Sequence, residues 1–281
     1  MSTPKLLAFD LDGTLLNSRG EILESSKQAI AAARAAGIKV VLATGRHHVA
    51  ARPYHYQLEL DTPVVCCNGA YIMDFSQPDP VYSNPLSKEL ARQIIEIAHE
   101  YGLHMLMYVD DAMTFEVLNP HMEKLCAWAN RQPEIVRPNI QQIASIPERM
   151  ESAKAIHKFV LSHPDQEYFL AAYERIAARD EFSCERSWID RFDITSSGNT
   201  KGSTLLRLAA QWNIDAEDII AVGDNDNDVS MIQIAGLGVA MDDGSEPLKR
   251  CADLIIGSND EDSIAAFIES HILAHNKAAN S

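Results

Sequence analysis

Two aspartates stand one residue apart directly after a short apolar run, in the stretch LLAFDLDGTLL near the start of the chain. The run at residues 6–9 predicts a buried strand, and Gly13 breaks it, so Asp10 and Asp12 follow the strand's carboxyl end. Open α/β sheets bind ligands at that edge. If the chain stays extended, both carboxylates point to the same side and repel each other unless a cation lies between them. The spacing therefore predicts a metal ion at this position.

Two further stretches could hold an anion. Thr44 and Gly45 follow a second apolar strand at residues 38–43, and a hydroxyl with adjacent backbone N–H groups suits an anion at a helix start. Lys201, in SGNTKGS, begins a helix after a glycine-bearing loop and adds a positive charge beside the helix N-terminus. This combination favours a phosphate group. The segment is not a phosphate loop, because it lacks the GxxxxGKS or GxxxxGKT spacing and follows no apolar strand.

A cluster of acids follows another predicted strand. The stretch AVGDNDNDVSM runs from apolar residues through a glycine turn into Asp224, Asp226 and Asp228. Carboxylate oxygens without nitrogen or sulfur ligands favour Mg²⁺ over zinc. Each motif alone could be a helix cap, a turn or a solvated loop. Their joint placement at strand ends and helix starts favours a single site that holds a metal ion and an anion.

The elements that carry these motifs alternate at both ends of the chain. Residues 6–69 predict the order β-α-β-α-β, which implies a parallel sheet with right-handed crossovers. After residue 190 the alternation resumes, with strands predicted at 218–224, 237–241 and 253–257. In a parallel sheet the carboxyl ends of these strands lie at one edge, where the motifs would meet.

The middle of the chain has a different pattern. Half-buried strands predicted at 103–117 and 155–163 interleave with helices at 87–102 and 165–180. This mixture is typical of an α+β unit with one open sheet face. We therefore expect an α/β fold in which a Rossmann-like parallel-sheet core is interrupted by an inserted α+β cap. The expected core comprises residues 1–83 and 191–281, and the expected cap comprises residues 84–190.

Composition limits the class of partner. The chain has 281 residues, a formal charge of −16 and a pI of about 5.0, which argues against nucleic acid or an anionic membrane as partner. Its five cysteines form no CxxC pair, so we expect free thiols and no zinc site. Neither a signal peptide nor a run of about 18 apolar residues is found. We expect a cytoplasmic protein; its oligomeric state cannot be read from the sequence.

The four motifs DLDGT, ATGR, NTKG and GDNDND, in this order, resemble those of the haloacid dehalogenase-like hydrolases. They are most similar to the Cof-type subgroup, whose large α/β cap is inserted after the third core strand. The resemblance spans essentially the whole chain. Within the subgroup, the segments TGRHHVAARPY, LDTPVVCCNGAY, LMYVDDAMTFE and SWIDRFDI are most similar to the pyridoxal phosphate phosphatases of bacteria.

This resemblance implies a catalytic role for each acid. Asp10 would attack phosphorus and form an aspartyl-phosphate. Asp12 would protonate the leaving oxygen and later take a proton from the attacking water. Mg²⁺ would be held by the carboxylates of Asp10 and Asp224 and by the backbone carbonyl of Asp12. Such an ion would offset the repulsion between an anionic nucleophile and an anionic substrate.

The resemblance also implies how the phosphoryl group would be held. Lys201 and Thr44 would contact its oxygens, with the Asp228 carboxylate orienting Lys201 or the waters of the metal. Capping of a helix is the simpler role for Asp228. The complete phosphate-binding set expected is Leu11, Thr44, Gly45, Lys201 and Asn227.

The expected activity is Mg²⁺-dependent hydrolysis of a small phosphomonoester, with pyridoxal 5′-phosphate as the substrate that the resemblance implies. The alternative is a broad sugar-phosphate phosphatase that acts on erythrose 4-phosphate and hexose phosphates. Trp188 could stack on a flat ring, and Asp110, Asp111 and Asp190 could face its polar or cationic positions. Core packing for Trp188 and a hairpin turn for Asp110 and Asp111 are the structural alternatives.

Two other classes use similar residues. A phosphoryl-accepting signalling domain also combines an aspartate, Mg²⁺, Thr and Lys on a parallel sheet, but it needs neither a second aspartate two residues on nor an inserted cap. A non-catalytic binding protein on this scaffold would be expected to lack Asp10 or Asp12, and both are present. An enzyme is therefore the favoured interpretation.

Overall fold

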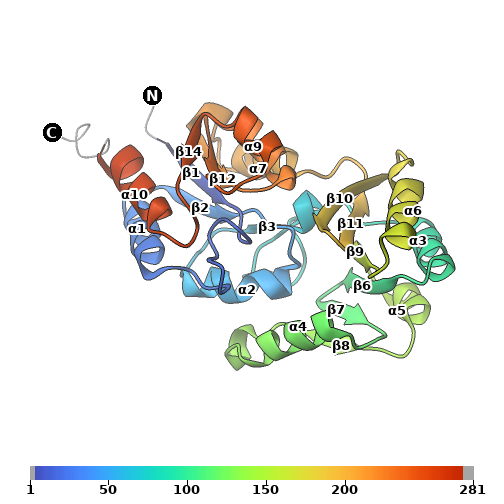
Figure 1. The fold of residues 1–281 in the computed structure, drawn as a ribbon. Coiled ribbons are helices and arrows are strands. Elements are labelled where there is room, and N and C mark those ends of the chain that lie inside the picture. The colour runs from blue at the N-terminus through green and yellow to red at the C-terminus, as the bar shows by residue number, and fades with distance from the viewer. Residues whose placement is uncertain (1–3, 275–281) are drawn as a thin grey trace. The chain divides into compact units, whose positions relative to one another are not determined.

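A computed structural model describes residues 4–274, apart from the side chains at positions 187 and 188. The chain forms two compact units, which Figure 1 shows in ribbon form. The first unit comprises Met1–Gly45, Tyr54–Pro80 and Thr200–Ser281, and the second comprises Arg46–Pro53 and Val81–Asn199. Within residues 4–274, every helix is too short or too polar to cross a membrane.

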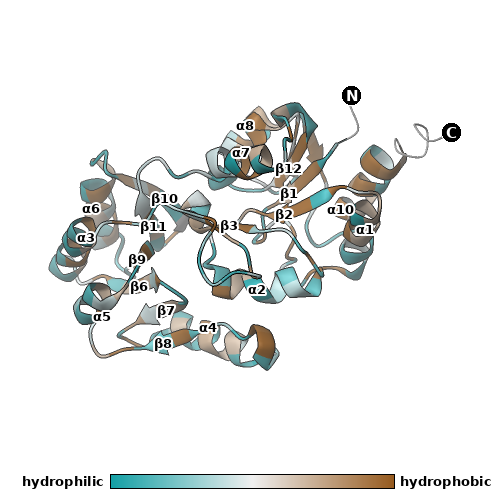
Figure 2. Cartoon of the chain, turned by 180° about the vertical axis from the view of Figure 1, so that it is seen from behind, coloured by the Kyte–Doolittle hydropathy of each residue, from teal (hydrophilic) through white to brown (hydrophobic). Residues whose placement is uncertain are grey.

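A five-stranded parallel sheet in the order β14-β13-β12-β1-β2 forms the centre of the first unit. Its central strands β1 and β12 are built from apolar residues, coloured brown in Figure 2, and every residue of both strands is buried. The strands are β1 (Leu6–Phe9), β2 (Lys39–Leu42), β12 (Ile219–Gly223), β13 (Leu237–Met241) and β14 (Leu254–Ile256). A short β3 (Val64–Cys66) adjoins β2 through a parallel bridge and pairs with β4 (Tyr71–Met73).

Helices pack against this sheet. Helix α1 lies beside α10 and the wider π-helical turn η5, whereas α7 packs against α8. The helices are α1 (Glu24–Ala35), α7 (Lys201–Gln211), α8 (Val229–Ile234), α9 (Glu246–Cys251), α10 (Ser263–Phe267), η1 (Cys67–Gly69), η3 (Ala216–Asp218), η4 (Asp226–Asp228) and η5 (Ile268–Leu273). Helix α2 (His48–Gln57) is divided between the units, because its residues up to Pro53 belong to the second. The predicted α/β class with a Rossmann-like parallel sheet is confirmed.

The second unit is built on a six-stranded sheet in the order β10-β11-β9-β6-β7-β8. The strands are β6 (His104–Val109), β7 (Ala112–Phe115), β8 (Ile140–Gln142), β9 (Ile156–Ser162), β10 (Phe182–Trp188) and β11 (Arg191–Ser196), with β5 (Tyr82–Ser83) preceding them. The helices are α3 (Lys88–Glu100), α4 (Pro120–Asn130), α5 (Ile146–Ser152), α6 (Gln166–Ala177) and the short η2 (Glu134–Val136).

Alternation along these strands gives the sheet two different faces. Met107 and Phe159 lie in one hydrophobic cluster with Ile94 of α3 and Phe169 of α6. The neighbouring positions, which point to the opposite face, carry both polar and apolar side chains, such as Lys158 and Val160. One face therefore forms the apolar core of the unit and the other is mixed.

The position of β11 differs from the expected domain boundary. The boundary at residue 190 would assign Arg191–Ser196 to the core, but β11 pairs antiparallel with both β10 and β9 in the second unit. A tight turn after Trp188 returns the chain directly beside β10, so the strand stays in the same sheet.

Candidate active site

The candidate site lies in the first unit, where β1 and β12 end side by side. Parallel pairing places Phe9 opposite Val222, and the backbone N–H of Asp10 donates to the Val222 carbonyl at 3.0 Å. The residues that follow each strand, Asp10 and Asp224, are therefore brought together from positions more than two hundred residues apart. The Asp10 side chain is buried, whereas Asp12 is exposed.

Lys201 is the positive charge of the site. It is the first residue of α7, after the capping residue Thr200, and is fully buried. Its Nζ donates to Asp10 Oδ1 and to Asp228 Oδ1, both at 2.6 Å. Burial alone would lower the pKa of Lys201, but these two carboxylates raise it above its usual value. The ammonium group is therefore held in its charged form.

Asp228 is fully buried and uses both carboxylate oxygens. Oδ1 accepts from Lys201, while Oδ2 accepts from the backbone N–H groups of Asp224 and Asn225, each at 3.0 Å. With Asn225 it forms the capping box of η4. The same side chain thus caps a helical turn and orients Lys201.

Asp224 is fixed by a contact that the sequence did not suggest. Thr14 Oγ1 donates to Asp224 Oδ1 at 2.7 Å. Gly13 lies directly beside this carboxylate with φ of +83°, and a Cβ atom there would collide with Asp224. Glycine at position 13 therefore serves both the left-handed backbone and the close approach of the acid.

The acids fit a hard divalent cation. Asp10, Asp224 and Asp228 each offer a carboxylate oxygen, and these oxygens lie within 4.8 Å of one another. Three carboxylates face a single ammonium group, so the cluster carries excess negative charge. Burial, together with the neighbouring carboxylates, raises the pKa of Asp10 well above its usual range and that of Asp224 to about 7. An all-oxygen donor set with this excess charge suits Mg²⁺.

Asp226 does not join this cluster. It is exposed, and its Oδ1 accepts from the hydroxyl of Ser245 at 2.6 Å. Of the three aspartates in GDNDND, two therefore turn inward toward Lys201 and one remains at the surface.

The residues expected to hold a phosphoryl group lie around the same strand ends. Leu11 and Thr44 are fully buried, and Gly45 adjoins the side chain of Asn68. Asn227 Nδ2 donates to Asn68 Oδ1 at 3.2 Å. The buried Oδ1 of Asn227 has no hydrogen-bond partner within residues 4–274. It is therefore available to a bound group.

Asn68 is not among the site residues expected from the sequence, in which Asn68-Gly69 is a pair typical of a turn. The turn is present, since Asn68 has φ of 56° and Gly69 has φ of 94°. Yet Asn68 is 3% exposed, which is unusual for a turn residue, and its carboxamide contacts Asn227. Only the fold brings these two side chains together, so the local pattern held no signal for the second role.

The cap candidates lie in the second unit and separate into two environments. Asp110 has φ of 46° at the turn between β6 and β7, and its Oδ1 accepts from the backbone N–H groups of Lys154 and Ala155 at 2.9 Å each. Its Oδ2 accepts from Arg149 at 2.8 Å. Burial opposes ionisation, but these hydrogen bonds prevail and lower the pKa of Asp110. The Asp110 side chain thus has a structural role.

Asp111 and Asp190 are more open. His48 Nε2 contacts Asp111 Oδ1 at 2.9 Å, although the Asp111 side chain remains 70% exposed. Asp190 accepts from Nε of Arg191 at 3.4 Å. The remaining candidate, Trp188, has its side chain outside the described part of the structure.

Comparison with known proteins identifies the family. Residues 7–268 match the model of the haloacid dehalogenase-like hydrolases. The chain is 40% identical to the Escherichia coli protein named pyridoxal phosphate phosphatase YbhA, over 96% of this chain and 100% of that protein. It is 30% identical to a Bacillus subtilis protein, 5-amino-6-(5-phospho-D-ribitylamino)uracil phosphatase YitU, over 95% of this chain and 97% of that one.

A solved structure extends the likeness to three dimensions. A haloacid dehalogenase-like hydrolase from Bacteroides thetaiotaomicron aligns with a TM-score of 0.83 and 28% identity, covering 95% of this chain and 99% of that one. Because sequence and structure agree over nearly the full length, the chain belongs to the haloacid dehalogenase-like hydrolase family.

Proposed function

We propose that this phosphatase hydrolyses pyridoxal 5′-phosphate with Mg²⁺ through an aspartyl-phosphate on Asp10. The observation that carries the chemistry is the environment of Asp10. Its carboxylate ends a buried strand, with one oxygen held 2.6 Å from Lys201 and two further acids nearby. A carboxylate fixed in this way beside a cation is suited to attack an anionic phosphoryl group.

The reaction would take place in two displacements. A carboxylate oxygen of Asp10 bonds to phosphorus as the ester P–O bond breaks, and Asp12 protonates the departing alcohol oxygen. Asp12 then accepts a proton from a water molecule whose oxygen attacks phosphorus, which releases inorganic phosphate and restores Asp10. Exposure of Asp12 supports this role, because the alcohol must leave and the attacking water must reach the carboxylate from solvent.

The remaining residues would hold charge. Thr44, Lys201, Asn227 and the backbone N–H groups of Leu11 and Gly45 would contact phosphoryl oxygens, on which charge persists during transfer. Asp10, Asp224 and the backbone carbonyl of Asp12 would hold Mg²⁺. The ion would add positive charge beside the carboxylates of Asp10, Asp224 and Asp228, which Lys201 alone does not balance. Asp228 would keep Lys201 in place through the 2.6 Å ion pair.

The choice of substrate rests on the relative at 40% identity, because the motifs of the core would handle only the phosphoryl group. Selectivity would then come from the second unit, with Asp111, Asp190 and Trp188 as the candidates from the sequence.

The test is a comparison of kcat/KM for pyridoxal 5′-phosphate, erythrose 4-phosphate and glucose 6-phosphate, with p-nitrophenyl phosphate as a measure of basic phosphatase chemistry. Pyridoxal 5′-phosphate is expected to have the highest value. A sugar phosphate that exceeds it by more than about tenfold, or about 1.4 kcal/mol in transition-state binding, would replace this proposal by the broad sugar-phosphate activity. If the protein hydrolysed none of these four compounds, the proposed phosphatase chemistry itself would be contradicted.

A further inference from the structure

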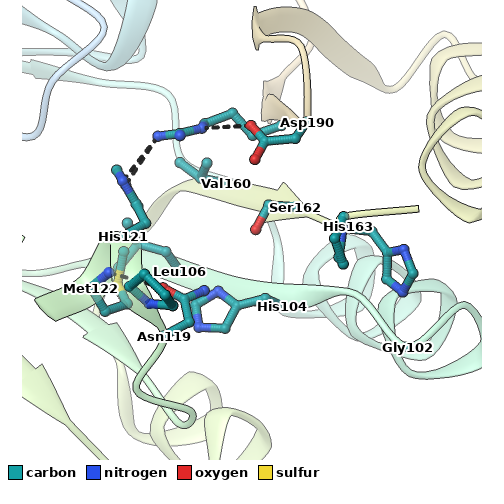
Figure 3. A pocket seen from close by; sticks show the side chains of 13 residues that line it. Gly102, His104, Leu106, Asn119, His121, Met122, Val160, Ser162, His163 and Asp190 are labelled. Atoms are coloured by element: carbon teal, nitrogen blue, oxygen red, sulfur yellow. Dashed lines mark hydrogen bonds and ion pairs between the residues drawn. The ribbon is translucent and has the colours of Figure 1, made fainter. Parts of the chain in front are cut away.

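The second unit contains a cavity of about 440 Å³ that is lined by none of the proposed catalytic, metal-binding or phosphate-binding residues and by one selectivity candidate, Asp190. It lies on the sheet face opposite the hydrophobic cluster and is lined by the ends of β6, β9 and β11 and the start of α4 (Figure 3). Its position is at the end of β6 that begins with His104, whereas His48 contacts the other end at Asp111. The two ends are about 17 Å apart, given the rise of a strand.

The floor of the cavity consists of two rows of side chains across neighbouring strands. Leu106 pairs with Val160 and forms an apolar row. His104, Ser162 and Arg191 form the second row, because Ser162 pairs with both of the others. The cavity thus combines an apolar surface with an adjoining polar edge, as sites for small organic molecules commonly do.

Arg191 supplies the charge of the polar edge. Its Nε donates to Asp190 at 3.4 Å, and its Nη1 donates to the imidazole of His121 at 3.1 to 3.2 Å. Nη2 has no hydrogen-bond partner in the described part of the chain. Partial burial and the nearby Arg191 lower the pKa of His121 to about 4, so at neutral pH this imidazole accepts a hydrogen bond and adds no charge.

The other polar groups have defined hydrogen-bonding roles. His104 Nε2 donates to the Val117 carbonyl at 2.7 Å, so this contact uses one ring nitrogen and leaves Nδ1 for a ligand. His163 Nδ1 lies 3.0 Å from the backbone N–H of Asp165 and 3.1 Å from its carbonyl oxygen, so the Asp165 backbone holds this ring in place. The hydroxyl of Ser162 lines the cavity and has no hydrogen-bond partner among the side chains that the structure describes. Unused donors therefore gather around Arg191.

We propose that this cavity binds a small organic anion. The apolar body would lie on the row of Leu106 and Val160, and one oxygen of a carboxylate or phosphate group would accept from Arg191 Nη2 and the Ser162 hydroxyl. His104 Nδ1 would accept from a hydroxyl or N–H group on the ligand. This site belongs to the second unit alone and does not depend on the proposed function.

The experiment measures binding at the cavity itself. The imidazole proton signals of His104, His121 and His163 are followed by NMR during titration with benzoate, phenylphosphonate or neutral benzyl alcohol. Saturable shifts are expected with benzoate, phenylphosphonate or both, which separates a carboxylate ligand from a phosphate ligand. Benzyl alcohol is expected to bind at least about tenfold more weakly, because it lacks the charge that Arg191 recognises.

Variants connect binding to the named groups. Arg191→Gln is expected to weaken binding of the anion about tenfold or more, and Ser162→Ala by a smaller factor. The matched control Arg186→Gln removes an exposed guanidinium from the same hairpin, where it lies over the Phe169 ring, and should leave binding unchanged. All three variants should keep wild-type hydrolysis of p-nitrophenyl phosphate.

Three outcomes would overturn the proposal. These are shifts that do not saturate with either anion, equal binding of benzyl alcohol, and an effect of Arg191→Gln no larger than that of Arg186→Gln.

Discussion

Among the described residues, each unit buries one lysine, and the two lysines differ in the charge around them. In the first unit Lys201 contacts Asp10 and Asp228, with Asp224 close by. In the second unit Lys158, which is 3% exposed, forms an ion pair with Asp193 at 2.5 Å and lies over the Tyr108 ring. The pair of Lys158 with Asp193 is electrically neutral, whereas the group around Lys201 retains excess negative charge.

This difference separates a structural ion pair from a reactive site. A buried neutral pair requires no further ion, and removing one partner leaves an uncompensated charge. A cluster with excess carboxylates raises their pKa values and binds a cation or a proton instead. Replacing an acid by its amide should therefore have opposite consequences in the two units.

The largest effect is expected for Asp10→Asn. Turnover of p-nitrophenyl phosphate should fall by about four orders of magnitude or more, because the amide cannot act as the nucleophile. The unfolding temperature should not decrease, since the change removes one charge from an overcharged cluster and Lys201 keeps Asp228 as partner. Phosphate release and thermal unfolding measure the two effects. Near wild-type turnover would contradict the assignment of Asp10.

The same change in the neutral pair should have the reverse outcome. Asp193→Asn removes the carboxylate that forms the ion pair with Lys158 and should lower the free energy of unfolding by about 3 kcal/mol or more. Denaturant titration measures this loss. As the matched control, the double variant Lys158→Met with Asp193→Leu should recover most of it, because two apolar side chains need no charge compensation. A single variant as stable as wild type would show that the pair is not a structural element.

A smaller effect is expected from a buried imidazole in the second unit. His157 is 1% exposed, and burial lowers its pKa to about 4, against about 6.5 in an unfolded chain. The unfolded state therefore binds this proton more readily, so stability is lost as the pH falls from about 6.5 to about 4. The loss from this group is about 3 kcal/mol at most.

Chemical denaturation at several pH values tests this dependence. His157→Gln should flatten the decrease in stability over that pH range, whereas the exposed His99→Gln on α3 should leave it unchanged. Equal slopes for wild type and His157→Gln would mean that His157 is not protonated differently in the two states.

The smallest effect of a substitution is expected in the concentration of metal that the enzyme requires. Asp224→Ala should raise the Mg²⁺ concentration needed for half-maximal activity about tenfold or more, because one carboxylate ligand is lost. Asp226→Ala is the control, since Asp226 is exposed and contacts Ser245. Chelation should abolish activity and Mg²⁺ should restore it. Full activity in excess chelator would exclude the metal from the reaction.

The sequence predicted those parts of the fold whose pattern is local. The apolar runs marked β1 and β13 at their observed bounds, because buried parallel strands are continuous hydrophobic stretches. The motifs also led to Asp10 and Lys201, which prove to be in contact. Polar groups placed after buried strands are informative because few other roles require them there.

Non-local features could not be predicted in this way. Helix α4 has only Met122 and Ala129 buried, so no amphipathic period reveals it, although Asn119 and Pro120 form a recognisable helix start. The contact of Thr14 with Asp224 and that of Asn68 with Asn227 join residues from distant parts of the chain. Such pairs become visible only when the strands are placed side by side.

The short segment Arg46–Pro53 bears on how the protein could be divided. It precedes the long insertion in sequence but belongs to the second unit, where His48 and Arg52 face Asp111. A recombinant fragment cut at residues 81 and 199 would therefore omit part of its own unit and expose the turn at Asp111. Transplanting this cap onto a related scaffold would require two separate pieces of chain to be exchanged together.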